Sequence, residues 1–216
     1  VKARKLLRAR YGRIYVRFGR PLQFSEVLEA SGLGQKPLTS KAAGELCHAI
    51  ADHTLSNINR QTVVTAQGLV AAALLNAPPQ GLSFEALNER VEIYLNYLVS
   101  QRIELADTLM LDRGYAIHFV LEDFLRQKWV RRRYRGAADT KSITEASYRV
   151  RSGRRQMLEY YKNGCLPVLL PAAQTALAVL ALDAFQFTAE DLSPVMGEME
   201  ERFADEFPVD PDRPLN

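Results

Sequence analysis

The sequence predicts a mainly helical protein of the α+β class, in which a small β-hairpin follows several helices and one further strand lies near the N-terminus. Three observations carry this prediction. Apolar residues recur at helical spacing over most of the chain, two β-prone segments flank a polar loop, and residues 13–18 alternate between polar and apolar. Of the 216 residues, 47% are apolar and 25% are charged, which indicates a folded protein with a sizeable core.

The first predicted element is a strand at residues 13–18. Its apolar side chains, Ile14, Val16 and Phe18, occupy one face, and Gly19-Arg20-Pro21 ends it. Residues 1–10, ahead of the strand, form a short basic segment that is expected to be the end of a helix. A single strand is not stable in water, and nothing else in the first hundred residues offers a partner strand.

Helices are expected next, from apolar spacing and from residues that favour helix ends. Ser40 and Thr65 are expected caps, Ser83 starts a third helix, and Pro171 suits a first turn. The predicted helices cover residues 40–57, 66–76, the stretch from Ser83 to about residue 98, 113–127, 153–163, 171–182 and 188–207.

Two β-prone segments, 128–134 and 146–151, surround a polar loop and predict a hairpin. Helix, hairpin, helix is the element order of a winged-helix module, although many small α+β units share it.

His118 and Asp123 have the spacing H-x-x-x-x-D, in which acyltransferases pair a general base with an orienting carboxylate. Here both residues fall inside one amphipathic helix, where a separation of five positions turns the two side chains apart. The pair is therefore not expected to be catalytic.

Other combinations also fail to specify a site. Cys47, His48 and His53 lack the partners that would complete four metal ligands, and Gly32-Leu-Gly34 follows no strand. Cys165 lacks an identifiable His partner and is expected to be a buried or bystander thiol. We expect no catalytic, cofactor-binding or metal-binding residues in this chain.

Residues 164–182 carry no charge, and their length prompts comparison with a membrane span. Pro167, Pro171, Gln174 and Thr175 interrupt the run, and much of the rest is Ala, so a buried core helix is the expected structure. No transmembrane segment is predicted.

Charge is distributed unevenly along the chain. Residues 1–36 carry nine Lys and Arg against two acids, residues 122–162 carry twelve against five, and residues 183–216 carry two against ten. The densest basic cluster lies at the hairpin and is interleaved with aromatic residues, a composition found in lipid-facing loops and in nucleic-acid-binding wings. The candidates for lipid contact are Arg126, Lys128, Trp129, Arg131, Arg132, Arg133, Tyr134 and Arg135.

Three stretches together resemble the bacterial glycerol-3-phosphate acyltransferase family and its dihydroxyacetone-phosphate acyltransferase relatives. Gly12-Arg-Ile-Tyr-Val-Arg-Phe-Gly-Arg-Pro21 resembles the strand that ends the acyltransferase domain of that family. Asn57-Ile-Asn-Arg-Gln-Thr-Val-Val-Thr65, followed by Leu69-Val-Ala-Ala-Ala-Leu-Leu75, is similar to the helical segment after it. Tyr160-Tyr-Lys-Asn163, followed by Leu169-Leu-Pro171, resembles an element of the C-terminal region.

The resemblance implies that the catalytic His/Asp block and the substrate-binding blocks lie upstream of this chain, which begins at Val1 without an initiator Met. Residues 1–36 would be the terminal strand and linker of a truncated α/β catalytic domain, and 37–216 a helical accessory domain that is itself incomplete. The parent enzyme would transfer an acyl chain from acyl-CoA or acyl carrier protein to the 1-hydroxyl of glycerol 3-phosphate, in phospholipid synthesis.

By the same resemblance, the expected partners are the upstream catalytic domain and an anionic membrane surface, with the protein peripheral at the cytoplasmic face. No specific nucleic-acid partner is expected. The portion described by this sequence would serve packing, membrane or partner contacts. The alternative is a winged-helix-like module that binds nucleic acid or protein through the basic hairpin at residues 126–135.

Overall fold

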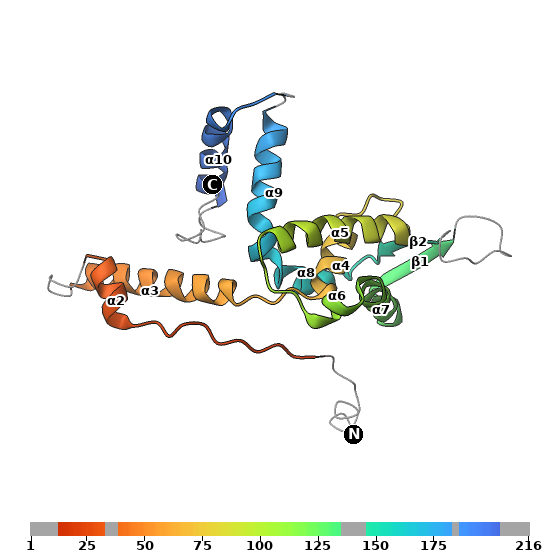
Figure 1. Cartoon of the computed structure of the whole chain (residues 1–216), viewed down its shortest axis with the longest axis horizontal. Coiled ribbons are helices and arrows are strands. Elements are labelled where there is room, and N and C mark those ends of the chain that lie inside the picture. Colours follow the sequence, from red (N-terminus) through yellow and green to blue (C-terminus); the bar gives the residue numbers. More distant parts are fainter. Residues whose placement is uncertain (1–12, 33–38, 135–145, 183–185, 204–216) are drawn as a thin grey trace, which may run out of the picture.

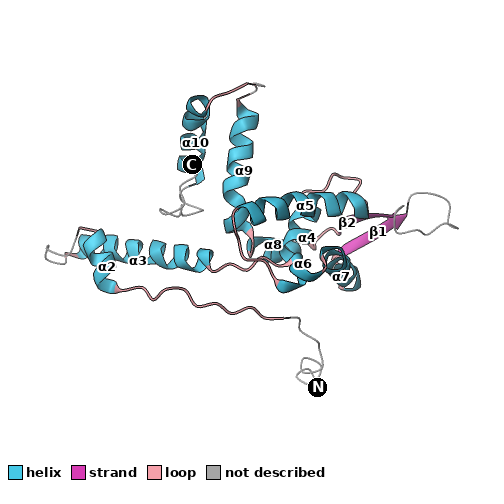
Figure 2. Ribbon diagram, viewed as in Figure 1, coloured by secondary structure: helices cyan, strands magenta, loops and turns pink. Residues whose placement is uncertain are grey.

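The computed structural model describes residues 13–32, 39–134, 146–182 and 186–203. This part of the chain is mainly helical with one two-stranded antiparallel sheet, which confirms the predicted fold class (Figure 2). In chain order its elements are α2 (Phe24–Ala30), α3 (Ser40–Arg60), α4 (Ala66–Leu75), α5 (Phe84–Ser100), α6 (Asp107–Leu111), α7 (Arg113–Arg126), β1 (Val130–Tyr134), β2 (Ala146–Val150), α8 (Arg155–Asn163), α9 (Leu166–Ala181) and α10 (Ala189–Phe203).

The helix boundaries agree with the sequence prediction at several caps and differ at others. Thr65 and Ser83 cap α4 and α5, with Ser83 Oγ accepting from Ala86 N at 3.1 Å. Thr39, rather than Ser40, caps α3. Helix α9 begins at Leu166, so the prediction that Pro171 lies in its first turn is wrong. Helices α2 and α6 were not predicted, and the expected helix end at residues 1–10 lies outside the described residues.

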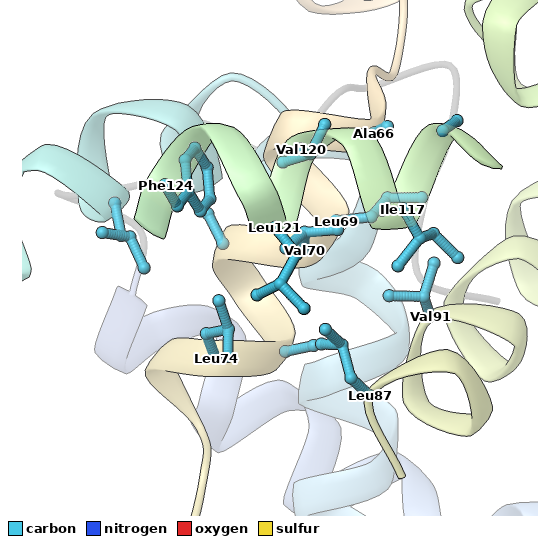
Figure 3. Packing of buried hydrophobic residues seen from close by; sticks show 14 of the residues in the cluster. Ala66, Leu69, Val70, Leu74, Leu87, Val91, Ile117, Val120, Leu121 and Phe124 are labelled. Carbon is cyan, nitrogen blue, oxygen red and sulfur yellow. The ribbon is translucent and has the colours of Figure 1, made fainter. Parts of the chain in front are cut away.

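Helix α4 is the centre of the fold. Nine of its ten residues are buried, because the helix is apolar on every side and neighbours cover it all round. Leu69, Val70 and Leu74 project from it toward α7 and α5 (Figure 3). Helix α7 contributes Ile117, Val120, Leu121 and Phe124 to the same cluster, and α5 contributes Leu87 and Val91.

The hairpin is fixed to this core through one face. Val130, Arg132 and Tyr134 of β1 lie opposite Val150, Tyr148 and Ala146 of β2, and Val130, Tyr148 and Ala146 are buried. Leu82 and Tyr148 exchange two backbone hydrogen bonds, at 3.0 and 2.7 Å. Gly81 allows this approach: its φ is +89°, and a Cβ there would lie 2.6 Å from the Tyr148 carbonyl oxygen.

Two helical arms project in Figure 1 from the body of the molecule, by which we mean α4–α8 with the hairpin. Helices α2 and α3 form one arm, in which Val27, Ala42 and Leu46 are buried. Helices α9 and α10 pack on each other and form the second arm. Large apolar side chains remain exposed on both arms, among them Leu55, Ile58, Leu177 and Leu180.

Residues 13–22 run as an extended chain below α3 toward α6 (Figure 1). The sequence predicted a half-buried strand at 13–18, but this segment pairs with no strand in the described part of the chain. Its apolar side is open to solvent, with Ile14 84%, Val16 70% and Phe18 92% exposed. The backbone is extended as predicted, but no sheet among the described residues pairs with it.

Among the described residues, no single helix has both the length and the apolar character to cross a membrane; α8 and α9 satisfy both criteria only as a pair, across a 94° bend.

Candidate functional site

The three stretches that carry the family resemblance meet at one place, although they lie far apart in the sequence. The extended segment, the turn between α3 and α4, and the end of α8 surround two adjoining cavities of about 610 and 440 Å³. Val63 and Gly164 line both cavities. We call this region the junction groove, and its other lining residues are Tyr15, Val16, Arg17, Gly19, Arg20, Leu22, Thr54, Asn57, Ile58, Gln61, Thr62, Thr65, Gly68, Tyr160, Tyr161, Asn163 and Cys165.

The extended segment is held to the body by its polar face. Arg13 forms an ion pair with Asp107, and the Tyr15 hydroxyl donates a hydrogen bond to the same carboxylate. Arg17 pairs with Glu104 at 3.3 Å. In an extended chain, alternate side chains point to opposite sides, so these contacts leave Ile14, Val16 and Phe18 largely exposed, with Val16 at the edge of the junction groove.

The turn between α3 and α4 is fixed to the region just before α6. Val64 N donates to Glu104 O at 2.9 Å, and Ala106 N donates to Val64 O at 2.8 Å, forming an isolated parallel bridge. Thr65 Oγ1 then accepts from Gly68 N and caps α4. The residues that receive the extended segment, Glu104 and Asp107, therefore lie beside the same turn.

Helices α4 and α8 approach closely at the floor of the groove. A Cβ on Gly68 would lie 3.1 Å from Cys165 Sγ and 3.2 Å from Tyr161 O. Burial raises the pKa of the Cys165 thiol to about 11, and its Sγ donates to Lys162 O at 3.1 Å. A thiol in this setting stays protonated at neutral pH, so it is a poor nucleophile.

The two tyrosines of α8 have different surroundings. Tyr161 packs in an aromatic cluster with Phe124 and Trp129, at centroid distances of 5.7 and 5.9 Å, and burial raises its pKa. Tyr160 is 77% exposed and meets the Tyr161 ring edge-on at 5.5 Å. Tyr161 therefore anchors α8 to the core, while Tyr160 presents its ring to solvent.

The junction groove offers binding groups rather than a reactive pair. Its described lining supplies amides, hydroxyls, two arginines and apolar side chains, and includes no His, Asp or Glu. Over the described residues, no group of three or more His, Cys, Asp or Glu side chains is arranged to hold a metal ion. This lining therefore lacks the His or carboxylate groups that most often serve as general acids and bases.

The sequence-derived candidates for catalysis and metal binding lie elsewhere. The His118 ring contacts Phe84 of α5 edge-on at 5.8 Å, while the Asp123 carboxylate pairs with Arg126 of α7, so the two residues of the motif take different partners. Cys47, His48 and His53 are exposed on α3. Gly32 follows α2 with a φ of +65°, and Gly34 lies outside the described residues.

The lipid-contact candidates divide into inward and outward groups. Trp129 is half-buried against Phe124 and Tyr161. Arg132 pairs with Glu122 and lies over the Tyr148 ring, 5.5 Å from its centroid. Arg126, Lys128, Arg131, Arg133 and Tyr134 are exposed, although Arg126 is paired with Asp123, and Arg135 lies outside the described residues.

Sequence reasoning missed part of the outward cationic face. Arg149 lies directly opposite Arg131, and Arg151 follows β2 opposite Trp129, where Arg151 N donates to Trp129 O at 2.8 Å. Both arginines are exposed. The alternation of side chains along a strand could have identified them, because Arg149 and Arg151 fall on the opposite face from Tyr148.

Comparison with known proteins places the chain in a family. A family model described as "Glycerol-3-phosphate acyltransferase C-terminal region" matches residues 1–216. A glycerol-3-phosphate acyltransferase of Actinobacillus succinogenes is 32% identical over 96 residues, which cover 41% of this chain and 11% of the relative. One of Haemophilus ducreyi is 36% identical over 89 residues, covering 39% and 11%.

The matched region thus spans about a tenth of the length of these curated relatives. No solved structure matches the chain. Because the family model covers every residue, the chain belongs to the family of glycerol-3-phosphate acyltransferase C-terminal regions.

Proposed function

We propose that this chain is the C-terminal part of an enzyme that transfers an acyl chain from acyl-CoA or acyl carrier protein to the 1-hydroxyl of glycerol 3-phosphate. The bond-making groups would belong to an upstream catalytic domain. The family match over the whole chain carries this proposal. The lining of the junction groove is consistent with it, because the described residues there include no His, Asp or Glu that could act as the general base.

The experiment compares the isolated chain with the parent polypeptide that carries the upstream domain. Each is incubated with labelled glycerol 3-phosphate and acyl-CoA, and lipid-soluble label is measured. The parent should form acylated product, and the isolated chain should not. Turnover by the isolated chain that His118→Ala abolishes would place the catalytic base here after all and overturn the proposal.

The extended segment supports a joint between two domains, with the boundary in the linker near residue 36. Its polar face is attached to the helical body through Asp107 and Glu104, while Ile14, Val16 and Phe18 face outward. An alternating segment with an open apolar face is suited to complete the sheet and core of a neighbouring domain. We assign that role to the upstream catalytic domain.

The hairpin supports a second contact, with an anionic membrane at the cytoplasmic face. On its outer side Arg131 lies opposite Arg149, Arg133 follows on β1, and Lys128 and Arg151 are exposed nearby. Among the described residues none of these five forms an ion pair with a carboxylate. Like charges directly opposite on a hairpin repel, and an anionic surface would offset that repulsion.

This contact would be peripheral. The acylated product of the proposed reaction is itself an amphiphile, so an enzyme held at a lipid surface would release it where it is stable. Nucleic acid would also be attracted to the basic hairpin. Binding assays with DNA therefore distinguish the membrane contact from the alternative, a winged-helix-like nucleic-acid-binding module.

A further inference from the structure

Helices α6 and α7 carry an exposed apolar surface that the folding of this chain leaves uncovered. Met110 is 64% exposed, Leu111 80%, Tyr115 66% and Phe119 54%. We call these four residues the α6–α7 patch. Tyr115 and Phe119 stand one helical turn apart, and their rings stack with centroids 6.2 Å apart.

The patch is separate from the hydrophobic core. The opposite side of the same two helices supplies Leu109, Ala116, Ile117 and Val120, all buried. A surface helix needs one apolar face to pack on its own domain. A second exposed face of aromatic and aliphatic residues marks a contact with something outside the described chain.

Charges around the patch argue against an anionic lipid surface. Asp112 caps α7 and has no cation partner among the described residues, while Asp107 is paired with Arg13 and Glu122 with Arg132. The nearby cations are already engaged, Arg113 with Glu92 at 3.0 Å and Arg126 with Asp123. An apolar centre whose neighbouring charges are mostly paired fits the apolar surface of another domain better than an anionic membrane, which attracts unpaired cations.

The path of the chain indicates which protein surface this is. Arg13 and Tyr15 bind Asp107, the first residue of α6, so the first described residue of the chain lies at the start of the helix that carries Met110 and Leu111. In Figure 1 the extended segment ends below α6. Its outward side chains Ile14 and Val16 are 84% and 70% exposed, so the segment that binds the start of α6 carries an open apolar surface of its own.

We propose that the domain preceding Arg13 covers the α6–α7 patch as well as the outward face of residues 13–18, so that one composite interface seats the catalytic domain on this side of the body. This inference rests on the proposed function, which supplies that domain. Contacts of this kind between domains bury roughly 600–1,500 Å² and would place Phe119 and Leu111 in the interface core.

The test measures thiol labelling by a water-soluble maleimide. Leu111→Cys and Leu180→Cys are compared in a Cys47→Ser background, because Cys47 is an exposed native thiol. Leu180, on α9, is 76% exposed and serves as the matched control. Both variants are labelled in the isolated chain and in the parent polypeptide, without lipid and with vesicles of phosphatidylglycerol and phosphatidylcholine.

We expect the Leu111→Cys thiol to react rapidly in the isolated chain and at least about tenfold more slowly in the parent without lipid, while the Leu180→Cys thiol reacts at similar rates in both. A second variant, Phe119→Asp, should restore rapid labelling at position 111 in the parent.

Three results would overturn the inference: equal labelling of position 111 in the two polypeptides, protection that needs vesicles, or protection that grows with protein concentration and so reports a second copy. Acyl transfer by the parent is measured in the same samples. An active parent with an unprotected Leu111→Cys thiol would refute this interface and leave the proposed function standing.

Discussion

The guanidinium of Arg132 lies over the ring of Tyr148, 5.5 Å from its centroid, and pairs with Glu122 on α7. The neighbouring Arg131 and Arg133 point away from the core and are exposed. A run of three arginines that looks uniform in the sequence therefore holds one structural residue between two free ones, as strand alternation requires.

Arg132→Ala should destabilise the protein by about 1–2 kcal/mol, because it removes a cation–π contact and leaves Glu122 without its partner. Arg133→Ala, the matched control, should change the free energy of unfolding by less than about 0.5 kcal/mol. Urea denaturation monitored by circular dichroism measures both. Equal stabilities of the two variants would show that the Arg132 contacts contribute nothing measurable.

Gly68→Ala tests the close approach of α4 and α8. The added Cβ would meet Cys165 Sγ at 3.1 Å and Tyr161 O at 3.2 Å, so we expect a loss of about 1–2 kcal/mol despite the better helix propensity of Ala. Cys165→Ala in the same chain should recover part of that loss by removing the sulfur. Gly44→Ala on α3, where nothing lies within 4 Å, should instead stabilise by about 0.5–1 kcal/mol. A stabilising Gly68→Ala would contradict the packing described.

The thiol of Cys165 should make stability depend on pH in the alkaline range. Burial raises its pKa in the folded protein to about 11, from an ordinary value of 9.0, so the folded state holds this proton more tightly than the unfolded state. The resulting stabilisation is fully present below pH 9 and is lost as the pH rises toward 11, by up to about 3 kcal/mol.

This prediction is checked by measuring the free energy of unfolding from pH 8 to 10.5 for the wild type and for Cys165→Ala. Burial also raises the pKa values of Tyr148 and Tyr161, and those contributions are common to both proteins. The difference in the free energy of unfolding between the wild type and Cys165→Ala should become smaller as the pH rises. Parallel curves would mean that the thiol titrates with its ordinary pKa in the folded protein.

Hydrogen exchange reports on the extended segment. The described part of the chain provides no backbone partner for the amides of residues 13–18, so in the isolated chain they should exchange at nearly the rates of an unstructured peptide. In the parent polypeptide the same amides should be protected at least about a hundredfold, if they join a sheet there. Strong protection in the isolated monomer would reveal a β partner within this chain.

Much of the helical order was predictable because the signals are local. Thr65 and Ser83 are side chains that cap helices, and the structure places both at helix starts. Helix α9 was placed too late because Pro171 was assigned to the first turn, whereas Pro167 occupies that position and Pro171 is accommodated inside the helix. Helix α6 spans only five residues, too few to show a period.

The groove and the role of Trp129 depend on tertiary contacts, which no local pattern encodes. Beside five arginines in the sequence, Trp129 suggested a lipid anchor, but its ring packs with Phe124 and Tyr161 from α7 and α8. The inward position of Arg132 could have been predicted from the sequence. It lies two residues after the apolar residue Val130, and therefore on the same face of the strand.

The final prediction concerns the outer face of the hairpin. Reversing Arg131, Arg133 and Arg149 to Glu should abolish binding to vesicles that contain phosphatidylglycerol, because each cation near an anionic leaflet contributes about 1 kcal/mol. Losing three such contributions lowers partitioning by about a hundredfold, and the introduced acids add repulsion. Arg132 is left unchanged, since its substitution would disturb the hairpin itself.

The matched control reverses Lys41 of α3, Arg102 just after α5 and Arg202 of α10 to Glu, which changes the net charge by the same amount. Co-sedimentation at about 0.15 M salt compares the three proteins, and the control should pellet like the wild type. If the hairpin variant also pellets like the wild type, this face does not bind the membrane. A different result would favour a nucleic-acid-binding module: the wild type binds DNA with sequence selectivity at that salt concentration, and the hairpin variant does not. A purely electrostatic attraction to DNA is not selective and weakens steeply with salt.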